Sequence, residues 1–156
     1  MQKIVINVQY GGFGLSPLAL KRLAELQGRE CYFFKKENLL KGPYIPITIE
    51  EATAELMFDA FDIPNPNDVL PKQDNWWELS DEERRISNQK YKEHEINDRN
   101  LNRTDKHLVQ VVKELKEKAN GQCATLKIVD VPDNVEWEIE EYDGNEWVAE
   151  KHRRWD

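Results

Sequence analysis

The chain has few cysteines and no long apolar run, and both absences narrow its class. Its 156 residues include two cysteines, Cys31 and Cys123, each inside a strand-like stretch. Neither has a second cysteine or a histidine at zinc-ligand spacing, so we expect two buried free thiols and no metal centre. No apolar stretch reaches the ~20 residues of a membrane span, and MQKIVINV lacks a signal peptide's layout. We therefore expect a soluble, cytoplasmic protein.

Positive charge is also scarce. The sequence has 22 lysines and arginines against 30 aspartates and glutamates, a formal net charge of −8. Such a surface repels the phosphate backbone and argues against duplex nucleic acid as a partner. The acid is concentrated in DNVEWEIEEYDGNE at 133–146, and the final EKHRRWD reverses the sign.

No complete catalytic motif is present. The two cysteines fall in strand interiors, and Ser16 is better explained as a helix cap. The pair Glu150 and His152 could exchange protons, but residues two apart in a strand are a common pattern. The sequence thus favours binding over catalysis, with no cofactor.

Hydrophobic periodicity predicts one α/β or α+β domain, residues 1–156, with a mixed sheet. Residues 3–10 read as a first strand, Ser16 and Pro17 begin a helix that Gly28 ends, and residues 30–35 read as a second strand. If these two strands share a sheet, a right-handed crossover would place them parallel.

Residues 36–98 read as a mainly helical, polar insert. Thr48 and Glu51 form a capping box before an expected helix in IEEATAELMFDAF, and Ser80 and Glu83 form another. The second one opens a helix over 81–96 that has almost no apolar face. We expect that helix to be an exposed arm.

The last third returns to regular patterns. Thr104 is expected to cap a helix over 105–120, followed by strands at 123–131, 135–142 and 146–153. Asp143 and Gly144 predict a two-residue hairpin turn between the last two strands. That turn pairs Trp137 with Glu150 and Val135 with His152, and it places Lys151 opposite Glu136.

The stretch YGGFGLS, residues 10–16, nominates a site. Backbone amides of a glycine-rich loop beside a helix start can bind an anion. The pattern begins like the glycine-rich fingerprint of dinucleotide-binding proteins, but Pro17 stands at the position of the third glycine. No acidic residue stands about twenty positions later, at the end of a second strand, where it would bind the ribose. The alternative is a tight turn whose glycines adopt positive φ. Both explanations remain open.

Arginines and the chain end supply further candidates, because arginine binds phosphate or carboxylate bidentately. The polar end of the hairpin and the loop could form two walls of one pocket. The ligand-binding candidates are therefore Tyr10, Gly11, Gly12, Phe13, Gly14, Ser16, Arg99, Arg103, Glu150, His152, Arg153, Arg154 and Trp155.

The YGGFGLS opening and the ending EYDGNEWVAEKHRRW together resemble small phage and prophage proteins without an established activity. The resemblance covers about the first 35 and the last 55 residues. It implies a phage setting, and it does not extend to the middle of the chain.

Three functions follow as hypotheses. The first is a binding protein for a small anionic, nucleotide-like ligand, which in a phage setting would sequester a host immune signal. The second is a regulator or inhibitor that binds a host protein through its acidic surface. The third is a phosphoesterase-type hydrolase using Glu150 and His152. A homo-oligomer is compatible with each.

Overall fold

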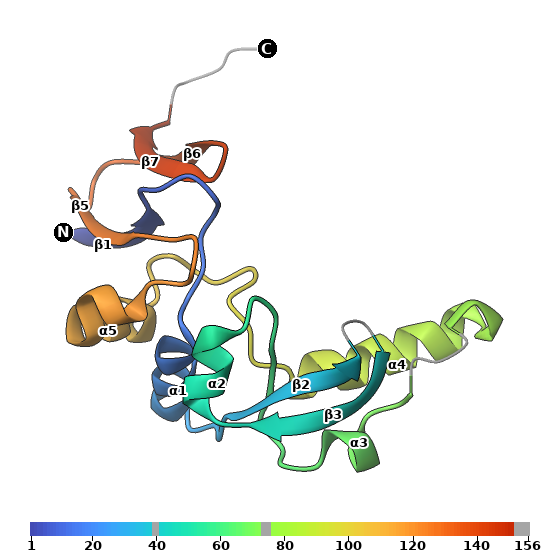
Figure 1. Cartoon of the computed structure of the whole chain (residues 1–156). Helices are drawn as coiled ribbons and strands as arrows, with labels where there is room; N and C mark the ends of the chain where they lie inside the picture. The colour runs from blue at the N-terminus through green and yellow to red at the C-terminus, as the bar shows by residue number, and fades with distance from the viewer. Residues whose placement is uncertain (39–40, 73–75, 152–156) are drawn as a thin grey trace. The chain divides into compact units, whose positions relative to one another are not determined.

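A computed structural model describes residues 1–38, 41–72 and 76–151 and confirms the α+β class (Figure 1). The chain divides into two compact units, one formed by residues 1–27 with those from 98 onward and the other by residues 28–97. The division lies near the bounds of the expected insert at 36–98, but it also includes the second strand. We call these parts the first and the second unit.

The first unit contains two antiparallel strand pairs and two helices. Its elements are β1 (Gln2–Asn7), α1 (Pro17–Leu26), α5 (Lys106–Leu115), a 3-10 helix (Lys116–Ala119), β5 (Leu126–Val131), β6 (Trp137–Tyr142) and β7 (Asn145–Glu150). β1 pairs with β5, and β6 pairs with β7. α5 contacts α1, β1 and β5, and it buries Leu108 and Val111 completely or nearly so.

β1 and β2 (Tyr32–Asn38) do not share a sheet, so the condition for a parallel crossover is not met, and the expected mixed sheet is not found among the described residues. β1 pairs antiparallel with β5, from Gln2 opposite Val131 to Asn7 opposite Leu126. β2 pairs antiparallel with β3 (Lys41–Ile47) and β4 (Asp59–Phe61) in the second unit. Every strand pair among the described residues is antiparallel. Periodicity identified both strands, but it carries no information about which distant strand satisfies the backbone of each.

The start of α1 is confirmed, whereas the start of α5 is shifted by one residue. Ser16 caps α1 by accepting a 3.1 Å hydrogen bond from the Ala19 amide. At α5, Asp105 is the cap and accepts from the amides of His107 and Leu108 at 2.8 and 3.1 Å. Thr104 instead donates its hydroxyl to Asn102. A carboxylate also interacts favourably with the helix dipole, which explains why Asp105 caps the helix.

The predicted hairpin is confirmed, including its register. Asp143 and Gly144 form a two-residue turn with φ values of 50° and 86°. Trp137 lies opposite Glu150, and the Lys151 amide donates to the Glu136 carbonyl at 3.0 Å. The expected pairing of Val135 with His152 lies outside the described residues.

The second unit is less helical than predicted. It contains the three-stranded sheet β3-β2-β4, α2 (Ile49–Ala54), α3 (Pro66–Val69), a 3-10 helix (Trp76–Glu78) and α4 (Asp81–His94). α2 has the expected capping box but ends at Ala54, and the chain then enters β4. β3 was missed because Pro43 and Pro46 argue against a strand, although prolines are tolerated in an edge strand.

The core of the second unit lies around Phe34, Phe61 and Leu70. The exposed character of α4 is confirmed, since only Ser87 among its residues is buried. The helix is capped by Ser80, which accepts from the Glu83 amide at 3.1 Å. α4 therefore stabilises this unit mainly through a few residues on one side.

Neither cysteine forms a disulfide, as predicted, but the two side chains are not buried in strands. Cys31 is half-buried just before β2, and Cys123 is exposed in the turn before β5. That turn is closed by a 3.1 Å hydrogen bond from the Ala124 amide to the Gly121 carbonyl. The apolar neighbours of Cys123 in sequence suggested a strand that in fact begins only at Leu126.

None of the helices in the described ranges combines the length and the apolar character needed to cross a membrane.

Replacing Gly144 by alanine should strongly destabilise the protein. An added Cβ would lie 2.2 Å from the Gly12 nitrogen, so the two backbone segments would have to separate. Gly28→Ala is a matched control, because Gly28 also has positive φ but faces open space. We expect Gly28→Ala to cost about 1 kcal/mol and Gly144→Ala about 2 kcal/mol more, measured by urea unfolding. Equal losses would contradict the close packing at Gly144.

Replacing residues 28–97 with a flexible glycine–serine linker should leave the first unit folded. All strand pairs of that unit, β1 with β5 and β6 with β7, lie within it. A single sigmoidal thermal transition in circular dichroism is the expected result, since loop length has only a weak effect on stability. A gradual melt without a baseline would show that the first unit needs residues 28–97.

Candidate functional site

The glycine loop of residues 10–16 packs against two other turns of the first unit. The Gly11 amide donates to the Asp143 carbonyl at 3.0 Å, and the Gly121 amide donates to the Gly14 carbonyl at 2.9 Å. A Cβ on Gly121 would meet the Gly14 backbone at 2.8 Å. Within the loop itself, a Cβ on Gly11 would meet the Cys123 Cβ at 2.8 Å, whereas a Cβ on Gly12 would face open space. Gly11 and Gly12 both have positive φ, which favours glycine, so these two glycines have a structural explanation.

Several amides of the loop are already engaged inside the protein. The Leu15 amide donates to the Asp98 carboxylate at 2.9 Å, and the Ser16 amide donates to the Ala119 carbonyl at 3.0 Å. The Ser16 hydroxyl also donates to the Lys118 carbonyl at 2.5 Å. An anion bound here would compete with these internal acceptors. The contacts therefore favour a structural role for this loop.

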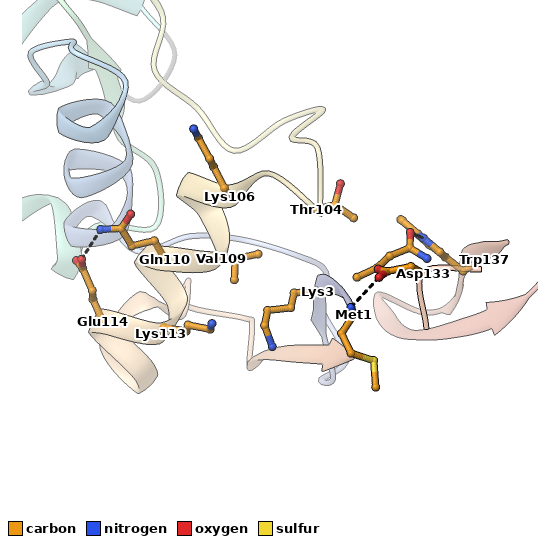
Figure 2. A pocket seen from close by; sticks show the side chains of 11 residues that line it. Met1, Lys3, Thr104, Lys106, Val109, Gln110, Lys113, Glu114, Asp133 and Trp137 are labelled. Carbon is orange, nitrogen blue, oxygen red and sulfur yellow. Dashed lines mark hydrogen bonds and ion pairs between the residues drawn. The ribbon is translucent and has the colours of Figure 1, made fainter. Parts of the chain in front are cut away.

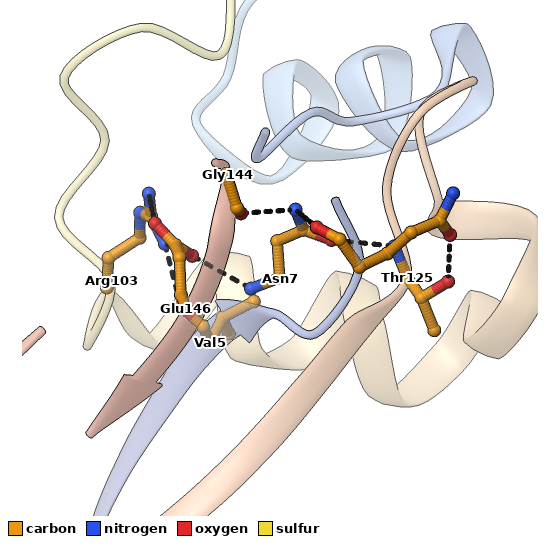
Figure 3. A network of polar contacts seen from close by, with 7 residues as sticks. Val5, Asn7, Arg103, Thr125, Gly144 and Glu146 are labelled. Carbon is orange, nitrogen blue, oxygen red and sulfur yellow. Dashed lines mark hydrogen bonds and ion pairs between the residues drawn. The ribbon is translucent and has the colours of Figure 1, made fainter. Parts of the chain in front are cut away.

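Arg103, a predicted ligand arginine, forms a bidentate ion pair with Glu146. The two hydrogen bonds are 2.7 and 3.0 Å long, and Glu146 is only 8% exposed (Figure 3). The guanidinium carbon lies 3.7 Å from the centre of the Phe13 ring. Phe13, another candidate, thus covers the ion pair. Both residues are committed to the fold.

Asn7 extends this ion pair into a buried network (Figure 3). The backbone amide of Asn7 donates to the Glu146 carboxylate at 2.8 Å, and its side-chain nitrogen donates to the carbonyls of Gln9 and Gly144. Its side-chain oxygen accepts from the Thr125 amide at 2.8 Å. Asn7 is fully buried, so each of these hydrogen bonds compensates a polar group removed from water.

Asn7 and Glu146 were not identified from the sequence, although each is a polar residue in an otherwise apolar pattern. Asn7 ends the otherwise apolar run IVIN, and the confirmed hairpin register places Glu146 on the same face as Val148. A polar residue on an apolar face requires a partner. What the sequence did not contain was the identity of that partner, Arg103, 43 residues away.

Of the remaining candidates, Tyr10 belongs to the glycine loop itself, and the structure does not bring Arg99 or Glu150 to a shared site with it. Tyr10 is 61% exposed, and Arg99 is exposed in the segment before α5. Glu150 lies at the end of β7 far from the Gly144 turn, so the structure does not place it beside the loop. The candidates His152, Arg153, Arg154 and Trp155 lie outside the described residues.

A hollow of about 720 Å³ lies elsewhere in the first unit (Figure 2). Its walls come from the start of β1, one face of α5 and the indole of Trp137. The α5 face consists of Lys106, Val109, Gln110 and Lys113, which follow the i, i+3, i+4, i+7 spacing of one helix side.

Most charges around the hollow are already paired. Glu114 accepts from Arg22 at 2.9 Å, and this hydrogen bond lowers the pKa of the Glu114 carboxyl. Lys3 contacts Asp130 at 2.7 Å, and that hydrogen bond lowers the pKa of Asp130. Asp133 pairs with the amino group of Met1 at 3.0 Å.

Lys106 and Lys113 form no ion pair with the residues that the structure describes. Lys113 contributes to the lowered pKa of Asp130, after the stronger effect of Lys3, but from beyond ion-pair distance. Both lysines lie at exposed positions of α5 beside the hollow.

The Trp137 ring is held in place by Gln2. The indole nitrogen donates to the Gln2 side-chain oxygen at 2.9 Å. The Gln2 side-chain nitrogen in turn donates to the carbonyls of Pro132 and Val135 at 2.9 and 3.1 Å. Trp137 also packs against Ile4, Ile6 and Val131, as a half-buried ring. It forms a rigid aromatic wall of the hollow.

No group of three histidine, cysteine, aspartate or glutamate side chains in the described part of the chain is placed to hold a metal ion. Comparison with family models, curated proteins and solved structures found no match. The geometry of the site therefore carries the functional argument.

Replacing Glu146 by glutamine should destabilise the protein by about 3 kcal/mol, because Arg103 would remain buried without its carboxylate. Glu138→Gln is the matched control: it removes a carboxylate from the exposed face of the same hairpin. We expect this control to unfold within about 0.5 kcal/mol of the parent in urea.

Adding Arg103→Met to Glu146→Gln tests the pair directly. The double variant should lose less stability than the sum of the two single variants, since the unpaired guanidinium is removed. Additive losses would contradict a coupled ion pair.

Proposed function

We propose that the protein binds a small anionic, nucleotide-like ligand without turning it over, and that the hollow beside α5 is the site. The observation that carries this proposal is the combination of two unpaired lysines, Lys106 and Lys113, with the aromatic wall of Trp137. It replaces the glycine loop as the proposed ligand contact.

The lining fits the two parts of a nucleotide. An aromatic side chain can stack on any nucleobase, and lysine binds phosphate as a point charge. The volume of about 720 Å³ lies within the range of small-molecule sites, about 300–1,000 Å³. Val109, which is 7% exposed, lies between the two lysines at the floor of the hollow.

Binding without catalysis is proposed because the carboxylates of the hollow are occupied. The lowered pKa of Glu114 makes it a poor proton donor near neutral pH, and its ion pair with Arg22 makes it a poor base. Asp133 is likewise held by the amino group of Met1.

The resemblance to phage and prophage proteins supports a biological setting for this proposal. A phage protein that binds a nucleotide in the cytoplasm of the host could sequester a signal of the host's immune response. In that setting, tight binding suffices and turnover is unnecessary.

A thermal-shift panel of mono-, di- and cyclic nucleotides tests the proposed site. We expect at least one nucleotide to raise the melting temperature by several degrees at saturating concentration. The double variant Lys106→Gln/Lys113→Gln should lose this shift, whereas Lys127→Gln, a lysine exposed on β5 outside the hollow, should keep it.

Two results would count against the proposal. If no nucleotide shifts the melting temperature, with or without Mg²⁺, the proposed ligand class is wrong. If the shift survives in the double variant, the proposed site is wrong. Chromatography of the bound nucleotide separates the remaining alternatives, because an intact ligand supports a binder and a product supports the phosphoesterase.

Binding of a host protein is a second candidate, which the outer face of the β6–β7 hairpin favours. Glu136, Glu138 and Glu140 are exposed at alternate positions of one strand. Tyr142 and Trp147, which are 71% and 43% exposed, lie near the turn of the same hairpin. Aromatic residues are enriched in protein interfaces, so this face suits a basic partner.

A further inference from the structure

We infer that the ligand of the hollow carries two phosphate groups, one for Lys106 and one for Lys113. This inference rests on the proposed function and specifies the ligand class for the same site. The two lysines are seven residues apart, which places them on one side of α5 about 10 Å apart along its axis.

On this side of α5, the two residues between the lysines, Val109 and Gln110, are uncharged. Val109 is almost fully buried. The side-chain nitrogen of Gln110 donates to the Glu114 carboxylate at 2.8 Å, the contact drawn in Figure 2. A single phosphate placed beside one lysine would be attracted by that lysine alone, whereas a second phosphate would add the attraction of the other. Two phosphates along the helix would neutralise both.

The opposite wall accounts for the rest of the ligand. Trp137 is fixed by Gln2, so its ring needs no reordering when a base stacks on it. The hollow's volume is in the upper part of the range for small-molecule sites, which leaves room beyond a mononucleotide. Lysine side chains are flexible, so the two phosphates could be adjacent or separated.

Isothermal titration at low salt with three probes tests this inference on the full chain. The probes are a nucleoside monophosphate, a nucleoside diphosphate and a cyclic dinucleotide, the last two carrying adjacent and separated phosphates. We expect at least one two-phosphate probe to bind about tenfold more tightly than the monophosphate, because one additional hydrogen bond between charged groups changes the affinity by about that factor. The two-phosphate probe that binds more tightly shows whether the site prefers adjacent or separated phosphates.

The single variants Lys106→Gln and Lys113→Gln decide whether the lysines cause this preference. Each variant should reduce the tenfold difference to about twofold or less, whereas Lys127→Gln should retain it. Thermal unfolding without ligand confirms that the variants are folded, since both lysines lie at exposed positions.

The possible failures are distinguishable. If the monophosphate binds as tightly as both two-phosphate probes, or the difference persists in both lysine variants, the inference is wrong and the proposed function stands. If none of the three probes binds to the parent protein, the proposed function fails as well.

Discussion

The buried ion pair between Arg103 and Glu146 is the interaction on which the first unit depends. Removing two charges from water is costly, and the pair is stable only when its geometry and its other hydrogen bonds compensate that cost. Here both terminal guanidinium nitrogens contact the carboxylate, and the backbone amide of Asn7 donates to the same group. The pair therefore holds β1, β7 and the segment before α5 in one arrangement.

The same ion pair explains the glycine loop. Phe13 must cover the guanidinium at 3.7 Å, which brings the loop onto the hairpin turn at Gly144. Contact that close excludes a side chain at Gly144, whereas Gly12 is favoured by its positive φ of 107°. The arginine that was a candidate for ligand binding thus contacts the loop from inside the fold.

Local signals predicted local structure well, and distant pairing was where prediction failed. The Ser16 cap, the capping box of Thr48 and the Asp143–Gly144 turn each depend on a few adjacent residues, and all were correct. The partner of β1 is β5, more than 100 residues away, and no local pattern encodes that pairing. The hollow was missed for the same reason, because its walls come from three distant segments.

Net charge and local charge act at different distances, and this difference limits what the hollow can bind. The formal charge of −8 repels large polyanions over the whole surface, whereas two unpaired lysines attract an anion only at short range. A duplex would bring many phosphates near acidic surface, but a small ligand brings its phosphates only to α5. An acidic surface and a hollow lined by Lys106 and Lys113 are therefore compatible with one another, and the proposed two-phosphate ligand depends on this difference in range.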